Sequence, residues 1–318
     1  MVYSKKCRFQ AGPLLKSIAE GPELGKAFWL RTFDNIRIRL AHWKCSKRRG
    51  TVFLLPGRAE YIEKYGRTAK IICDLGYDVI VLDWRGQGLS DRLDGDPLLG
   101  QIKEFSEYQH DLDAAIDFSQ RYHLPEPWFI LAHSMGGAIG LRAAHRNLGF
   151  KAAAFTGPMW GIVGPALINP FKHIIAKLAI VLGQADNYAL TTSRESYIAV
   201  SEFLGNTLTK DQEMWSYMKR QVIEHTNLQL AGPSYRWVNA ALREIKELHA
   251  LPPPECPGLC LVGDGESIVE KNRIKTLMSR WSNGRLIEVP DALHEILMLN
   301  NHRQNVILND ICGFFARS

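Results

Sequence analysis

The stretch LAHSMGGAIGLRAA, residues 131–144, decides the fold of this 318-residue chain. It begins in an apolar run and continues with helical periodicity, which predicts a strand, a tight turn and a helix. Ala132 and Gly136 are small, as a sharp strand-to-helix turn that exposes Ser134 requires. We therefore expect Ser134 to be a nucleophile and the Met135 backbone N–H, at a helix N-terminus, to face an anion. The alternative is that Ser134 only caps the helix.

Strand-like and helical segments alternate on both sides of this stretch. Continuous apolar runs, typical of strands buried on both faces, occupy residues 51–57, 77–88, 128–132 and 151–155. Helical patterns separate them at residues 64–76, 105–121 and 135–146. Segments 28–33 and 36–43, joined by Asp34-Asn35, predict an antiparallel hairpin. The alternation predicts an α/β fold with a mostly parallel central sheet flanked by helices.

This alternation stops after residue 156 and resumes near residue 256. The intervening residues show helical patterns only, at 171–184, 193–204, 211–224 and 234–249. Strand-like runs then return at 259–262 and 285–289, before a C-terminal helix. We therefore expect one core, residues 1–156 and 256–318, with a helical cap, residues 157–255, inserted between the sixth and seventh core strands.

A serine nucleophile needs a general base and an orienting carboxylate, which follow it in the chain in this type of fold. His294 lies in the loop after strand 285–289, whereas His302 is about two helical turns farther on. We expect His294 to be the base, His302 to face solvent and His133 to have a structural role.

The orienting carboxylate is expected at the end of the preceding strand. Glu266 and Asp264 are the candidates, with Asp291 as a third. Glu266 is modestly favoured, because the apolar Ile268 and Val269 that follow it can anchor the loop against the core.

A tetrahedral oxyanion needs a second amide donor, from the loop after the strand at 51–57. Gly57 permits a close turn there, and the Arg58 amide is the expected donor. The Arg58 side chain need not take part. Pro56 stands where many hydrolases have histidine, so a His-Gly signature is absent.

The net charge of +6 is concentrated near the N-terminus, where residues 1–50 carry twelve Lys/Arg and three Asp/Glu. This surplus either contacts an anionic membrane surface or forms a solvated face. No aromatic-plus-basic motif accompanies it, so no nucleic-acid partner is expected. The chain has neither an apolar run of transmembrane length nor a signal-peptide pattern. We expect a cytoplasmic protein, with peripheral contact at the inner membrane face as the alternative that the basic surplus suggests.

Six cysteines are scattered along the chain, which predicts free thiols rather than a disulfide framework. Cys256 and Cys260 are four residues apart, but no second Cys/His pair follows at zinc-site spacing. Neither a metal nor a cofactor is expected.

The chain resembles the α/β-hydrolase lysophospholipases of bacteria, relatives of the monoacylglycerol lipases. The resemblance spans residues 50–300 and rests on PGRAEYIEKY (56–65), GYDVIVLDWRGQGLSDR (76–92), AHSMGGAIGLR (132–142), GDGESIVEKN (263–272) and PDALHEIL (290–297). It implies the α/β-hydrolase fold and hydrolysis of the carboxylic ester of a single-chain lipid.

The resemblance also implies residue roles. Ser134, Glu266 and His294 would form the triad, with Arg58 and Met135 as amide donors. Lysophospholipases of this kind often carry glutamate followed shortly by valine where monoacylglycerol lipases carry aspartate. The pattern here is that of the lysophospholipases.

Other functions use the same machinery. A monoacylglycerol lipase, a general carboxylesterase and a carbon–carbon hydrolase need the same triad, and a binding protein can use the same fold without catalysis. The apolar segment 160–185, broken by Pro165, is expected either to form a movable lid or interfacial segment or to pack the cap's own core. The aromatic residues that either line an acyl groove or fill that core are Trp160, Phe171, Trp215 and Trp237.

Overall fold

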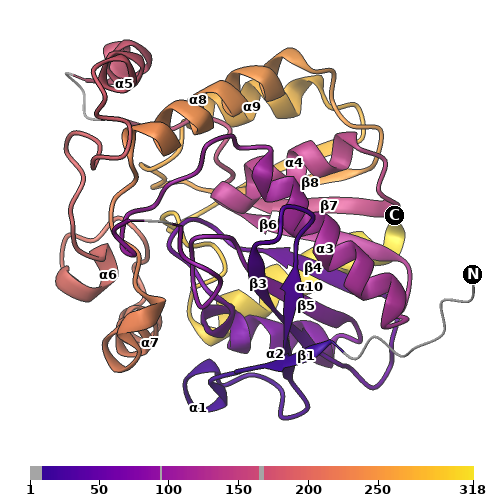
Figure 1. The fold of residues 1–318 in the computed structure, drawn as a ribbon. Coiled ribbons are helices and arrows are strands. Elements are labelled where there is room, and N and C mark those ends of the chain that lie inside the picture. The colour runs from indigo at the N-terminus through magenta and orange to yellow at the C-terminus, as the bar shows by residue number, and fades with distance from the viewer. Residues whose placement is uncertain (1–8, 94, 165–167) are drawn as a thin grey trace, which may run out of the picture.

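The computed structural model describes residues 9–93, 95–164 and 168–318 and has a central nine-stranded sheet (Figure 1). The strand order is β1-β2-β3-β5-β4-β6-β7-β8-β9. The strands are β1 Gln10–Gly12, β2 Lys26–Arg31, β3 Arg37–Trp43, β4 Thr51–Leu55, β5 Asp78–Asp83, β6 Trp128–His133, β7 Phe150–Thr156, β8 Gly258–Gly263 and β9 Gly284–Val289. The predicted fold class is confirmed.

The strand directions divide the sheet into two parts. β1, β2, β3 and β5 pair antiparallel, whereas β5, β4, β6, β7, β8 and β9 pair parallel. The predicted hairpin is formed by β2 and β3, with Asn35 at φ 66° in the turn between them. β1 was not predicted, because three residues are too few for a periodic signal.

Helices cover both faces of the sheet and create two hydrophobic clusters. β4 is entirely buried, and its residues alternate between the clusters, with Phe53 and Leu55 in one and Val52 and Leu54 in the other. The first cluster includes side chains of α3 Glu107–Arg121, α4 Met135–His145, α8 Tyr235–Ala250 and α9 Lys271–Arg280. The second includes side chains of α2 Gly66–Asp74, α7 Gln212–Glu224 and α10 Asn301–Arg317. The short helices are α1 Lys16–Ala19, η1 Ile62–Tyr65, η2 Asn169–Phe171, α6 Tyr197–Val200 and η3 Thr226–Leu228.

The segment between β7 and β8 includes α5 Lys172–Val181 together with α6, α7 and α8. The helix expected at 193–204 is wrong in extent, because only the single turn of α6 is helical there. Three of the four aromatic residues singled out in this segment, Trp160, Trp215 and Trp237, are buried in the hydrophobic clusters, whereas Phe171 is 56% exposed. Pro165 lies outside the described residues.

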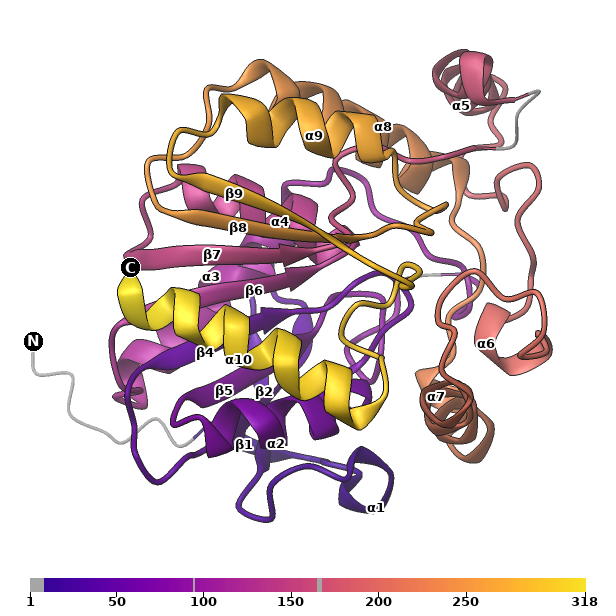
Figure 2. The ribbon, with the colours of Figure 1, turned by 180° about the vertical axis from the view of Figure 1, so that it is seen from behind.

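The carboxyl ends of the parallel strands meet at one edge of the sheet. Figure 2 shows α5, α6 and α7 beyond this edge, away from the body of the sheet. Within the described residues, no helix has the length and apolar character needed to cross a membrane. The cysteines of the described chain, Cys45, Cys73, Cys256, Cys260 and Cys312, are free.

Candidate active site

Ser134 occupies the sharp turn between β6 and α4. Its backbone angles are φ 50° and ψ −117°, a conformation that residues with a side chain rarely adopt. The Ser134 amide donates to the Thr156 carbonyl at 3.1 Å, and its carbonyl accepts from the amides of Gly137 and Met159, each at 2.8 Å. Three backbone hydrogen bonds therefore hold a strained residue in place, as is typical of functional sites.

Small neighbours make this turn possible. A Cβ atom on Gly136 would lie 2.2 Å from the carbonyl oxygen of Leu55, at the end of β4. A Cβ atom on Gly140 would lie 3.0 Å from the Cβ of Ala132. Helix α4 thus begins directly against the strands, and larger residues would displace Ser134 from the sheet edge.

His294 connects Ser134 to Glu266. Its Nε2 lies 2.9 Å from Ser134 Oγ, and its Nδ1 lies 2.7 Å from Glu266 Oε2. When Nδ1–H donates to the carboxylate, Nε2 is free to accept the hydroxyl hydrogen of Ser134. The three residues assigned to the triad are therefore brought together in hydrogen-bonding order.

Glu266 is held by the loop that follows β8. Its Oε1 accepts hydrogen bonds from the amides of Ile268 at 2.6 Å and Val269 at 3.1 Å. Burial raises the pKa of this carboxyl, but the hydrogen bond and charge interaction with His294 and the two amide bonds outweigh it and hold the pKa below its ordinary value. Glu266 is therefore ionised when it faces the imidazole.

The other carboxylates and histidines considered lie elsewhere. Asp264 accepts from the amides of Asp291 at 2.9 Å and Ala292 at 3.2 Å, so it fixes the start of the loop that carries His294. Asp291 is exposed and pairs with Lys210. His302 is an exposed residue of α10.

The two amides expected to bind an oxyanion flank the same edge. Arg58 follows the end of β4, and Met135 is the first residue of α4. Within the described part of the chain, neither amide donates a hydrogen bond to another protein group. Gln87 joins the two loops, because its Oε1 accepts from the Ala59 amide at 2.6 Å and its Nε2 lies 3.7 Å from Met135 Sδ. The sequence did not point to Gln87.

The Arg58 side chain is half-buried and has no acidic partner among the described residues. Its guanidinium donates to the Ala231 carbonyl and lies 5.4 Å from the centre of the Trp237 ring, and its Nε has no hydrogen-bond partner. Among the described residues, no carboxylate comes within ion-pair distance of it. Burial lowers its pKa to about 10, the direction expected for a cation without a counter-ion.

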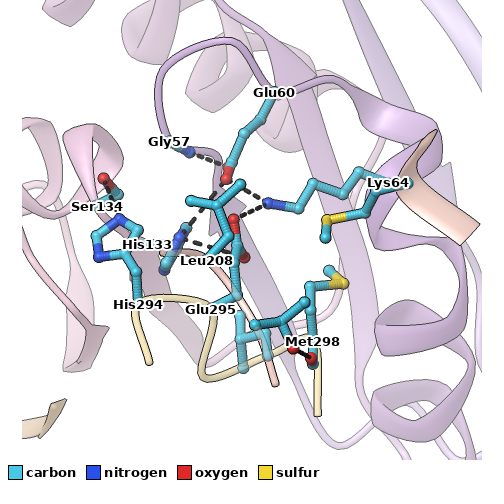
Figure 3. Close-up of polar contacts among 12 residues, drawn as sticks. Gly57, Glu60, Lys64, His133, Ser134, Leu208, His294, Glu295 and Met298 are labelled. Atoms are coloured by element: carbon cyan, nitrogen blue, oxygen red, sulfur yellow. Dashed lines mark hydrogen bonds and ion pairs between the residues drawn. The ribbon is translucent and has the colours of Figure 1, made fainter. Parts of the chain in front are cut away.

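His133 points away from Ser134 Oγ, into a buried group of charged residues that the sequence did not reveal (Figure 3). Glu60, His133 and Glu295 place one potential metal-ligand atom each within 4.8 Å of one another, and Lys64 binds both carboxylates. The ammonium group of Lys64 thus supplies a cation at this position. Glu60 and Lys64 lie in the quoted stretch 56–65, but nothing in their pattern distinguished them from exposed charges.

The family model described as serine aminopeptidase, S33, matches residues 46–300. The chain belongs to this family. The match covers all of the site residues, and the α/β-hydrolase fold expected from the resemblance is confirmed by solved structures. A soluble variant of monoglyceride lipase from Saccharomyces cerevisiae, in complex with a substrate analog, has a TM-score of 0.68 at 19% identity, covering 90% of this chain and 93% of that chain.

Two named proteins are similar in sequence. Lysophospholipase L2 of Escherichia coli strain K12 is 31% identical over 296 residues, which are 89% of this chain and 85% of that protein. Monoglyceride lipase of Rattus norvegicus is 28% identical over 161 residues, which are 48% of this chain and 51% of that protein. The expected resemblance to lysophospholipases and monoacylglycerol lipases is confirmed, and the chain is a hydrolase.

Proposed function

We propose that this protein hydrolyses the carboxylic ester of single-chain lipids, with Ser134 as nucleophile, His294 as general base and Glu266 as the orienting carboxylate. One observation carries the proposal: the continuous chain of hydrogen bonds from Ser134 Oγ through the His294 imidazole to Glu266. A hydroxyl positioned against a base that a carboxylate orients is the arrangement needed for acyl transfer.

In the first half of the reaction, His294 Nε2 takes the proton of Ser134 as Oγ attacks the ester carbonyl carbon. The Arg58 and Met135 amides donate to the resulting oxyanion. The carbon–oxygen bond to the alcohol then breaks, and the imidazolium of His294 protonates the leaving alkoxide. Glu266 remains ionised throughout and stabilises the imidazolium.

In the second half, water replaces the alcohol. His294 takes a proton from this water, whose oxygen attacks the acyl carbon and forms a second tetrahedral intermediate. The bond to Ser134 Oγ then breaks, His294 returns the proton to the serine, and the fatty acid leaves. His294 therefore takes up and gives back one proton in each half of the reaction, and the mechanism needs no cofactor.

We propose lysophospholipids as the preferred substrates. Lysophospholipase L2 is similar to this chain over most of both proteins, whereas the rat monoglyceride lipase matches about half of each. The Arg58 guanidinium adds a chemical reason, because it lies on the loop of the proposed oxyanion donor and has no acidic partner among the described residues. An arginine of this kind complements a phosphate, which a lysophospholipid has and a monoacylglycerol lacks.

We propose that residues 157–255 form a cap over this site. Arg58 of the core contacts Ala231 and Trp237 of this segment, which supports the cap as one wall of the substrate pocket.

We also propose that α5 contacts an anionic lipid surface. Its sequence KHIIAKLAIV buries only Ala176, and apolar side chains more than half exposed lie on it and beside it: Phe171, Ile174, Leu178, Val181 and Leu182. Cations lie on and beside this helix: the pKa of His173 is lowered first by burial and then by the charges of Lys172, Arg273, Lys177 and Lys246. An apolar face bordered by cations is typical of helices that lie in the interface of anionic membranes.

The proposed activity is tested by comparing the wild type with Ser134→Ala on substrates with one acyl chain. These are a lysophosphatidylcholine, a lysophosphatidylethanolamine, a monoacylglycerol and a short p-nitrophenyl ester, with fatty acid or nitrophenol release as the readout. We expect lysophospholipids to be turned over fastest and Ser134→Ala to lower kcat by about 10³-fold or more. A preference for the glyceride or the short ester would contradict the substrate, and turnover unaffected by Ser134→Ala would contradict the mechanism.

A further inference from the structure

Four buried charged side chains lie beside Ser134 and His294 of the proposed triad (Figure 3). They are Glu60, Lys64, His133 and Glu295, which we call the ion quartet, and none is more than 6% exposed. Charges are this deeply buried only when they are paired, because removing an isolated ion from water is very costly. The charges of the four side chains therefore have to add up to nearly zero.

Lys64 connects the two carboxylates of the quartet. Its Nζ binds Glu60 Oε1 and lies 2.6 Å from Glu295 Oε1. Glu60 also accepts a hydrogen bond from the Tyr65 hydroxyl. One cation between two carboxylates leaves a net charge of −1, which His133 can balance.

The contacts of His133 favour the charged form of its ring, although its Nε2 and Glu295 Oε2 make no hydrogen bond in the described structure. Its Nδ1 lies 2.9 Å from the Thr156 carbonyl oxygen, which can only accept, so Nδ1 bears a hydrogen. Its Nε2 lies 3.5 Å from Glu60 Oε1 and 3.5 Å from Glu295 Oε2. A neutral ring would aim the Nε2 lone pair at two carboxylate oxygens, whereas an imidazolium attracts both. The pKa of His133 agrees: burial lowers it, but Glu295 and Glu60 outweigh burial and raise it above its ordinary value.

The quartet is attached to three of the four loops of the proposed active site, those of Ser134, His294 and Arg58. His133 precedes Ser134, and Glu295 follows His294. Glu60 accepts a hydrogen bond from the amide of Gly57, the residue before Arg58. The His133 and His294 rings are 4.9 Å apart, so the charges of the quartet are close to the proposed base. These attachments connect the buried charges to the loops that carry the reacting groups.

We propose that the ion quartet positions the nucleophile, base and oxyanion loops and sets the electrostatic environment of the His294 imidazole. Its members are positioning residues, since none touches the reacting atoms. The inference rests on the proposed function, because it assigns a role to His294. The charged groups around His294 come from four parts of the chain: Glu266 after β8, Glu295 after β9, His133 of β6, and Glu60 with Lys64 in and just before η1.

The test uses two variants that remove opposite charges. Glu295→Gln removes a negative charge near His294, which makes its imidazolium less stable, so the acid limb of the kcat/KM–pH profile moves to lower pH. Lys64→Met removes a positive charge and moves the acid limb to higher pH. Each shift is expected to be on the order of one pH unit, because a nearby unit charge acts on the imidazole through an effective dielectric of ~20. Both variants should lower kcat about tenfold or more, with little change in KM, because positioning acts on the reacting geometry.

Two further measurements keep the test decisive if a single variant folds poorly. The charge-balanced double variant Lys64→Met/Glu295→Gln should have an acid limb near the wild-type position and a low kcat. In the wild type, nitrogen NMR shifts of His133 should show both ring nitrogens protonated at pH 7. Shifts in the same direction for the two single variants, or a neutral His133, would overturn the proposal. Loss of the proposed function would be recognised separately, since wild-type turnover would then not depend on Ser134.

Discussion

His294 Nδ1 lies 2.7 Å from Glu266, whereas Asp264, two residues earlier, binds backbone amides of the loop that carries His294. The two carboxylates therefore have different roles: Glu266 binds the imidazole, and Asp264 binds the main chain.

Glu266→Gln should lower kcat about 10³-fold or more, because an amide cannot stabilise the imidazolium. Asp264→Asn is the matched control and should retain kcat within about tenfold. Steady-state kinetics on a lysophospholipid measures both, and equal losses would contradict the assignment of Glu266.

The stability of the protein should depend on the ionisation of Glu266. Because its folded-state pKa is below the ordinary value of 4.5, the ionised carboxylate favours the folded state. This contribution is present above the unfolded-state pKa and is lost as the pH falls through the folded-state value. Denaturant unfolding at several pH values should show the free-energy difference between wild type and Glu266→Gln narrowing on acidification below about pH 4.5. A free-energy difference that does not change with pH would show that the Glu266 carboxyl has the same pKa in the folded and unfolded states.

Gly136 should tolerate no side chain, because its Cβ position lies 2.2 Å from the Leu55 carbonyl oxygen. Gly136→Ala is expected to lower the free energy of unfolding by about 1–3 kcal/mol and to abolish turnover by displacing Ser134. Gly313→Ala is the matched control, since its nearest neighbour is the flexible end of Arg317 at 3.3 Å in α10. It should raise the free energy of unfolding by about 0.5–1 kcal/mol. Denaturant titration distinguishes these outcomes, and an active, stable Gly136→Ala would contradict the steric argument.

The sequence could predict the fold because the features that specify it are local. The apolar run of β6, the small residues around Ser134 and the helical pattern of α4 are contiguous. His294 could be predicted because chain order leaves few histidines after the last strand. The choice among Glu266, Asp264 and Asp291 was less certain, because all three lie at the same edge of the sheet and only side-chain direction separates them.

The ion quartet could not be predicted, because its members come from separate parts of the chain. Glu60 and Lys64 are four residues apart, but Glu295 is 231 residues from Lys64. Charged residues are exposed by default, and their burial depends on a partner that only the tertiary structure supplies. His133 was assigned a structural role from its place beside Ser134, and its contact with two carboxylates required the packed core.

Arg58 should select for a phosphorylated headgroup. In Arg58→Met, the ratio of kcat/KM for a lysophosphatidylcholine to that for a monoacylglycerol with the same acyl chain should fall about tenfold or more, the value of a hydrogen bond to a charged group. Arg58→Lys, which keeps the charge but loses the planar fork, should lie between this variant and the wild type. Movement of the Arg58 amide would lower kcat/KM for both substrates alike, so it would leave this ratio unchanged. An unchanged ratio would mean that the guanidinium only joins the proposed cap to the core.

The exposed face of α5 should determine binding to anionic lipid. Leu178 and Val181 are 54% and 81% exposed on this face, and burying two such side chains in a lipid interface contributes enough free energy to change partitioning more than tenfold. The double variant Leu178→Ser/Val181→Ser should therefore sediment with phosphatidylglycerol-containing vesicles at least tenfold less than the wild type. Phe33→Ser is the matched control, because Phe33 is 94% exposed in the turn after β2, apart from α5.

Two results would contradict the lipid contact. Equal binding by the wild type and the α5 variant would show that another surface mediates it. A wild type that forms dimers in analytical ultracentrifugation, and that the α5 variant converts to monomers, would show that a second copy covers this face. Salt separates the two contributions to vesicle binding. The contribution of the lysines around α5 should weaken as ionic strength rises, because salt screens exposed charges. The contribution of Leu178 and Val181 should persist.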